Sequence, residues 1–213
     1  MVRTALGIRA ESRRKPGEVI GVTEPGGPAA DTPVPAEQAA DLAVVAVQLG
    51  RPARGVMAIA HRCPCGLPDV VQTAPRLPDG TPFPTLFYLT CPRACSAIST
   101  LEAAGVMREM TARLQSDRAL RARYLAAHED YLARRDEAAA AAGLEPLPPG
   151  TQSAGGMPDR VKCLHALAAY ALAVPGGNAL GADALRLAGE WWHAGPCVST
   201  ASQAADAARK ADG

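Results

Sequence analysis

Six cysteines are the residues of this chain best suited to do chemistry. Two lie one residue apart in the run Arg62-Cys63-Pro64-Cys65-Gly66-Leu67-Pro68, and two more lie in Thr90-Cys91-Pro92-Arg93-Ala94-Cys95. Single cysteines follow at Cys163 and Cys197. Thiolates bind soft metals, either a tetrahedral zinc ion or the iron atoms of a sulfur cluster. Because no Cys-x-x-Cys pair occurs, neither a zinc ribbon nor a thioredoxin-like motif is indicated.

The residues around four of the cysteines favour a role as metal ligands. Cys63, Cys91 and Cys197 each adjoin a proline, which ends regular backbone and leaves the sulfur presented from a turn. Cys163 is expected near the N-terminal end of a helix that opens at Pro158, where the helix dipole favours a thiolate. The predicted ligand set is therefore Cys63, Cys91, Cys163 and Cys197.

The kind of metal centre follows from the spacing of these ligands. Dispersed single cysteines are more usual for an iron–sulfur cluster than for a zinc ribbon, so the prediction is a 4Fe-4S cluster, with zinc as the alternative. Cys65 and Cys95 are then spare thiols, although Cys95 would share a helix face with Cys91 if a helix began there. Buried free cysteines are the competing interpretation, because an unpaired cysteine behaves as a small hydrophobic residue.

The residue types alone suggest two other kinds of site. Cys163 and His165 have the types of a nucleophile and its base. Residues two positions apart in a helix lie about 200° apart around its axis. If a helix runs through Cys163 and His165, their side chains point to nearly opposite faces, and we predict that they cannot pair. Arg76, Arg160 and Lys162 are candidate anion-binding residues, because Arg160 and Lys162 flank the predicted helix start. The glycines before this helix lack the Lys-Ser/Thr of a P-loop, so nucleotide binding is not indicated.

Composition restricts the class of protein. The formal net charge of +1 predicts no general attraction to nucleic acid or anionic membranes. Residues 1–16 lack the apolar core of a signal peptide, and no apolar run approaches the roughly 18 residues of a membrane span. We therefore expect a cytoplasmic protein, in which structural disulfides are disfavoured.

Hydrophobic periodicity predicts an α+β fold. Residues 1–36 mix charges with glycine and proline and predict a disordered tail, residues 37–198 a single globular domain, and residues 199–213 a flexible tail. Within the domain we expect a small three-stranded antiparallel sheet packed with about five or six α-helices, the helices filling the C-terminal two-thirds. The predicted strands are 56–60, 69–73 and 84–90. The predicted helices are 36–49, 92–105, 106–114, 117–142 with Ser116 as N-cap, 159–174 and 182–192.

Five longer runs carry a family pattern, namely Arg62-Cys63-Pro64-x-Gly66-x-Pro68, residues 74–85, residues 88–92, residues 101–105 and residues 156–165. These runs resemble the bacterial, mainly actinobacterial, family called domain of unknown function 501, and the similarity covers about residues 44–198. The motif cysteines of the family correspond to the four predicted ligands.

The resemblance implies no established activity. Family members are often encoded beside a septum-formation initiator and an exopolyphosphatase, which suggests by association a partner in the division machinery or in phosphate metabolism. Three hypotheses follow: a cytosolic protein that binds an iron–sulfur cluster or zinc in a structural, redox-sensing or catalytic role; a metal-free interaction protein associated with cell division; or a phosphate- or polyphosphate-related enzyme.

Overall fold

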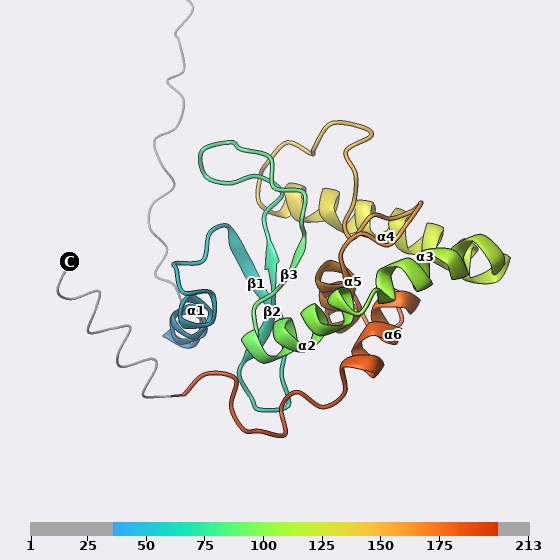
Figure 1. Ribbon diagram of the computed structural model, residues 1–213. Coiled ribbons are helices and arrows are strands. Elements are labelled where there is room, and N and C mark those ends of the chain that lie inside the picture. The colour runs from blue at the N-terminus through green and yellow to red at the C-terminus, as the bar shows by residue number, and fades with distance from the viewer. Residues whose placement is uncertain (1–35, 200–213) are drawn as a thin grey trace, which may run out of the picture. The chain divides into compact units, whose positions relative to one another are not determined.

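The computed structural model describes residues 36–199 of the chain. The tails predicted at 1–36 and 199–213 lie outside the described residues, apart from the innermost residue of each. Within the described range, three strands and six helices form an α+β fold in which helices dominate the C-terminal part, as the sequence predicts (Figure 1).

The sheet is antiparallel, with the strands in the order β1-β2-β3. These strands are β1 (Val56–Arg62), β2 (Pro68–Thr73) and β3 (Phe87–Leu89). The pair Val70 and Val71 suits the central strand, because β-branched side chains pack well on a pleated surface, and both are buried. β3 is shorter than the predicted 84–90, and the five residues that link β1 to β2 include two of the cysteines.

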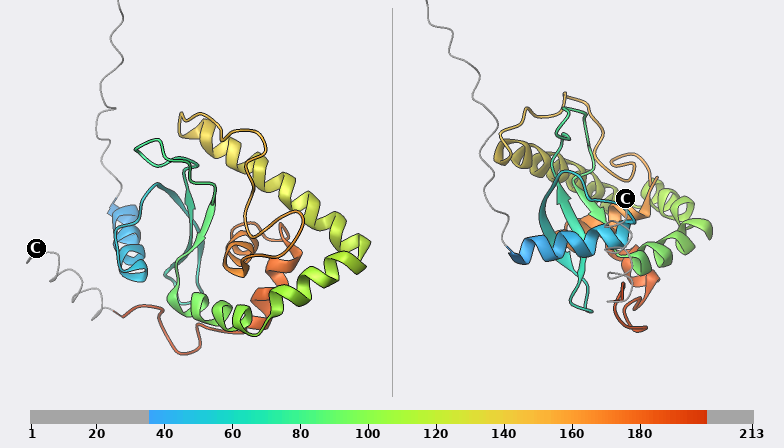
Figure 2. Two further views of the ribbon diagram at one scale, coloured as in Figure 1. Left: turned by 45° about the horizontal axis from the view of Figure 1, so that its top comes forward. Right: turned by 90° about the vertical axis from the view of Figure 1, so that its left-hand side faces the viewer.

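Helices cover both faces of the sheet. The helices are α1 (Ala36–Leu49), α2 (Pro92–Ala103), α3 (Val106–Ser116), α4 (Arg118–Ala141), α5 (Leu164–Ala173) and α6 (Ala179–Ala188). α1 contacts β2, whereas α5 contacts β3, and α1 and α5 lie on opposite sides of the sheet (Figures 1 and 2). α2 and α6 both pack against α5. The end of β3, which leads into α2, and the N-terminal end of α5 therefore both lie beside α2.

Three aromatic rings join β3, α4 and α5 at the centre of the core. The ring of Phe87 stacks on that of Tyr170 at a centroid distance of 5.9 Å and meets the edge of Tyr131 at 6.1 Å. The hydroxyl oxygen of Tyr131 accepts a 2.6 Å hydrogen bond from the backbone N–H of Leu86. This contact satisfies a polar group that burial would otherwise leave unpaired.

α5 begins later than the predicted residue 159. Gly155 and Gly156 both have positive φ angles, of 64° and 92°, and the backbone N–H groups of Lys162 and Cys163 both bond to the carbonyl oxygen of Gly155, at 2.6 and 3.3 Å. The chain therefore folds back on itself before the helix. Cys163 becomes the N-cap of α5, with φ −151° and ψ 114°, rather than a residue inside the helix.

α4 is capped by Asp117, not by Ser116 as predicted. The Asp117 carboxylate accepts a 2.9 Å hydrogen bond from the N–H of Leu120, whereas the Ser116 hydroxyl donates to carbonyl oxygens of the preceding helix. We expect Asp117→Ala to lower the free energy of unfolding by about 1 kcal/mol. Ser116→Ala is the matched control and should change it by less than about 0.5 kcal/mol. Urea denaturation measures both, and equal losses would contradict the assignment of the cap.

Candidate metal centres

The turn between β1 and β2 presents two thiols at one end of the sheet. The N–H of Cys63 donates to the carbonyl oxygen of Leu67 at 2.9 Å, and the N–H of Gly66 donates to that of Cys63 at 2.8 Å. Gly66 has a φ of 86°, which glycine adopts without strain. The short closed turn holds Cys63 and Cys65 together beyond the last residue of β1.

Cys91 reaches the same end of the sheet from β3. It is the N-cap of α2, as Pro92 at the first helical position suggested, and its sulfur accepts a hydrogen bond of 3.5 Å from the N–H of Ala94. Helix N-terminal amides stabilise a thiolate at this position. The sequence interpretation that a helix starts at Pro92 is confirmed.

Cys197 completes a group of four sulfurs that we call the thiol cluster. Its sulfur lies 3.7 Å from that of Cys65, and it interacts with Cys91, each of the two thiols shifting the pKa of the other. Cys63 is hydrogen-bonded to Cys65 and interacts electrostatically with Cys91. Cys91 is 0% exposed, Cys63 2% and Cys197 8%. The structure thus brings together three of the four predicted ligands, with Cys65, predicted to be spare, beside them.

The thiols of the cluster differ in acidity. The interaction with Cys197 lowers the pKa of Cys91, and the amides of Ala94 and Arg93 lower that pKa further. The same interaction, followed by burial, raises the pKa of Cys197. Burial raises the pKa of Cys63 to about 11. Of these three thiols, Cys91 is therefore the one that most readily supplies a thiolate.

Buried polar atoms without hydrogen-bond partners gather around the thiol cluster. The described residues contain six such side-chain atoms, and four belong to residues beside it: Gln48 Oε1, Asp69 Oδ2, Thr90 Oγ1 and Arg93 Nη1. The amide of Gln48 donates to the sulfur of Cys197 at 3.3 Å, and the charge of Asp69 acts on Cys63. Thr90 and Arg93 flank Cys91 along the chain. Unpaired buried polar atoms are rare, so those of Gln48 and Asp69, whose side chains interact with cluster thiols, fit a polar or charged group bound beside the thiols.

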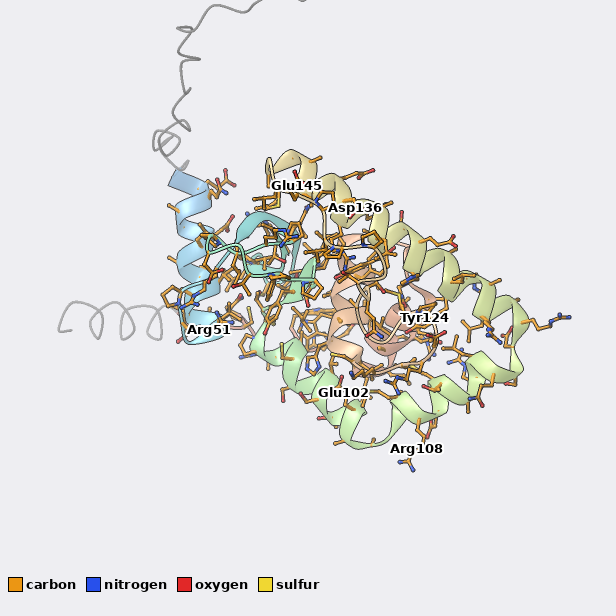
Figure 3. The ribbon with its side chains drawn as sticks, turned by 90° about the horizontal axis from the view of Figure 1, so that it is seen from above. Arg51, Glu102, Arg108, Tyr124, Asp136 and Glu145 are labelled. Carbon is orange, nitrogen blue, oxygen red and sulfur yellow. The ribbon has the colours of Figure 1, made fainter. Side chains whose placement is uncertain are left out.

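Cys163, the fourth predicted ligand, lies with a different set of residues. Its thiol, a carboxylate oxygen of Glu102 and a ring nitrogen of His165 all lie within 4.8 Å of one another, the one such group of three among the described residues. Glu102 comes from α2 and lies on the side of that helix facing α5, whereas Arg108 of α3 points away (Figure 3). We call these three residues the Glu–Cys–His group.

The prediction that Cys163 and His165 cannot pair is wrong. It assumed a continuous helix through both residues, but Cys163 has extended backbone as the N-cap of α5, so its side chain reaches His165. The hydrogen bond with Cys163 and then the charge of Glu102 raise the pKa of His165 to about 9. Glu102 had no local sequence signal, because only the packing of α2 against α5 brings it to this position.

A cavity of about 430 Å³ adjoins the Glu–Cys–His group. Cys163, His165 and Cys95 line one part of it, and Phe87 and Leu89 of β3 line another. The S–H of Cys95 donates to the carbonyl oxygen of Leu89 at 3.6 Å, and burial raises the pKa of Cys95 to about 11. Cys95 therefore lines the cavity as a neutral thiol rather than as a thiolate.

The three candidate anion-binding residues differ in their surroundings. The guanidinium of Arg76 donates to the carbonyl oxygens of Gly80, Glu145 and Pro146, at 3.2 to 3.3 Å. It therefore connects the loop before β3 to the loop after α4. Arg160 and Lys162 have exposed side chains in the turn before α5. The backbone carbonyl of Arg160 accepts a 3.1 Å hydrogen bond from the hydroxyl of Tyr124.

These features define an α+β protein with a cluster of four thiols, three of them buried, and a separate Glu–Cys–His group. Residues 59–186 match the family model described as a protein of unknown function, DUF501. Since the match spans more than half of the chain, the protein belongs to this family. No curated protein and no solved structure matches the chain. Within residues 36–199, no helix combines the length and apolarity needed to cross a membrane.

Proposed function

We propose that this protein binds an iron–sulfur cluster of the 4Fe-4S type through the thiol cluster. The observation that carries the proposal is the convergence of Cys197 with Cys65 and Cys91, residues from opposite ends of the domain. Cys65 replaces Cys163 in the ligand set predicted from sequence. Four cysteine thiolates are the usual ligand set of such a cluster.

The spacing of the sulfurs matches neither a 4Fe-4S cluster nor a single zinc ion without some movement of the thiols. A tetrahedral zinc with Zn–S bonds of about 2.3 Å requires every pair of sulfurs to lie about 3.8 Å apart. Cys65 and Cys197 meet this distance, at 3.7 Å, but no three sulfurs of the thiol cluster lie mutually within 4.8 Å. A 4Fe-4S cluster binds each cysteine to a different iron atom and takes a wider array, so it requires Cys65 and Cys197 to move apart. Zinc is the alternative occupant and requires the sulfurs to move closer.

The surroundings support a cluster that stabilises the fold. Three of the four thiols are almost fully buried, which restricts the access of a substrate. The thiol cluster connects the β1–β2 turn, the start of α2 and the segment after α6, which has no regular structure between Glu190 and Ser199. The N–H of Thr90 bonds to the carbonyl oxygen of Asp69, so the backbone next to Cys91 is held to β2. A bound cluster would fix the C-terminal segment to the sheet.

The proposal is tested by purifying the full chain without oxygen. We expect a brown protein with the broad visible absorption band typical of iron–sulfur proteins. It should contain about four iron and four sulfide ions per chain. Exposure to air should bleach the absorption and release iron. A colourless protein whose zinc is lost in Cys91→Ser would replace the cluster by the zinc alternative. A protein with neither metal, even after reconstitution with iron and sulfide, would overturn the proposal.

The other two hypotheses have weaker support. An interaction protein of the division machinery and a phosphate-related enzyme both stay predictions from the family resemblance. For the second of them, Arg76 is a poor anion ligand, because its guanidinium already donates to three carbonyl oxygens.

A further inference from the structure

The Glu–Cys–His group stands apart from the thiol cluster and has the donors of a mononuclear metal site. Glu102, Cys163 and His165 offer one oxygen, one sulfur and one nitrogen, all within 4.8 Å of one another. Both Glu102 and His165 are largely buried, with side chains 24% and 27% exposed. Zinc binds these three donor types, and its catalytic sites commonly use three protein ligands.

The ring of His165 is oriented for metal binding through Nδ1. Its Nε2 lies 3.1 Å from the carbonyl oxygen of Cys95, and a carbonyl oxygen can only accept, so Nε2 carries a hydrogen. Nδ1 then faces Glu102 Oε1 at 3.2 Å. Metal-binding histidines generally donate their other ring N–H to a backbone carbonyl or carboxylate in this way. Glu102 Oε1 is also an acceptor, so Nδ1 donates to it in the metal-free chain, and a bound cation would take the place of that proton between the two ligands.

Backbone contacts orient the other two ligands. Glu102 Oε1 accepts a 2.6 Å hydrogen bond from the N–H of Leu164, the first residue of α5, so the carboxylate is held at the helix start. As N-cap of α5, Cys163 has no hydrogen bond from its side chain to the helix amides. Its thiol is turned toward His165 instead. The carboxylate caps the helix and the thiol is left to serve as a ligand.

We propose that Glu102, Cys163 and His165 bind a single divalent cation of the zinc class, with the remaining coordination position directed toward the cavity that Cys163 and His165 line. The cavity, of about 430 Å³, has largely apolar walls from β3, which suits a small ligand with one metal-binding group. Nothing in this proposal depends on what the thiol cluster binds, because the two groups share no residue.

The competing interpretation of these contacts is a metal-free pair in which His165 is an imidazolium beside Cys163 and Glu102. The two interpretations differ in one measurable respect. A zinc ion bound to the sulfur of Cys163 blocks its reaction with an alkylating reagent, whereas an imidazolium leaves the sulfur open to it from the cavity.

The primary experiment is alkylation of Cys163 by iodoacetamide in the full-length wild-type chain, with and without zinc, followed by peptide mass spectrometry. We expect micromolar zinc to slow modification of the Cys163 peptide by about tenfold or more. Modification of Cys95, in the same cavity, is the internal control and should change by less than about twofold. An equal rate for Cys163 with and without zinc would overturn the proposal, and rapid reaction in both would favour the metal-free pair.

Variants of the other two ligands supply a second test with the same readout. Glu102→Gln and His165→Gln should each weaken protection of Cys163 by zinc by about tenfold or more. Cys95→Ser should leave that protection unchanged, and circular dichroism verifies that each variant is folded. Protection that persists in both Glu102→Gln and His165→Gln would overturn the proposed ligand set. Cys197→Ser, which removes a thiol-cluster ligand, should leave the protection of Cys163 by zinc intact. The proposal for the thiol cluster and the proposal for the Glu–Cys–His group can therefore be refuted independently.

Discussion

Replacing Cys91 with serine is expected to abolish retention of the metal by the thiol cluster and to destabilise the fold. Cys91 is fully buried, interacts with Cys197 and caps α2. Because the binding free energy of a structural metal adds to the free energy of folding, we expect a loss of roughly 5 kcal/mol or more. Iron, sulfide and zinc analysis and anaerobic urea denaturation measure the two effects.

Two further serine variants separate the ligand set of the structure from the one predicted by sequence. If the thiol cluster binds the metal, Cys65→Ser should lose iron and sulfide as Cys91→Ser does, and Cys163→Ser should retain them. The sequence-based set predicts the reverse for both residues. Loss of the cluster in Cys163→Ser, with retention in Cys65→Ser, would restore Cys163 as a ligand and refute the set proposed from the structure.

Replacing Phe87 with alanine is expected to cost about 3–5 kcal/mol of unfolding free energy. The Phe87 side chain is 6% exposed and contacts the rings of Tyr131 and Tyr170, which come from α4 and α5. Its removal leaves a cavity that the surrounding helices cannot fill without moving. Urea denaturation of the wild-type and variant proteins measures the loss.

Tyr88→Ala is the matched control for Phe87→Ala. Tyr88 is the next residue of the same strand, but its side chain points to the other face of the sheet and is 37% exposed. We expect it to cost about 1 kcal/mol or less. Similar losses for the two variants would show that the aromatic contacts of Phe87 do not dominate the core.

Much of the secondary structure could be predicted because local patterns specify it. The apolar spacing and flanking glycine gave the bounds of α1, and the Cys91–Pro92 step gave the start of α2. The start of α5 could not be predicted. Pro158 resembles a helix start, but two glycines with positive φ turn the chain back and delay the helix to Leu164. That turn depends on hydrogen bonds to Gly155 from residues seven and eight positions further on.

The sequence by itself determined which residues carry the chemistry: six cysteines, several in proline- or glycine-containing turns, and a histidine two positions after one of them. Only the tertiary structure decided how they group. Cys65 and Cys197 lie 132 positions apart in the chain, and Glu102 lies 63 positions before His165. Distances of this kind are set by how the helices pack against the sheet and against one another. Spacing along the chain carries no information about them, so the sequence analysis grouped Cys163 with the other cysteines, and only the structure places it beside Glu102 and His165.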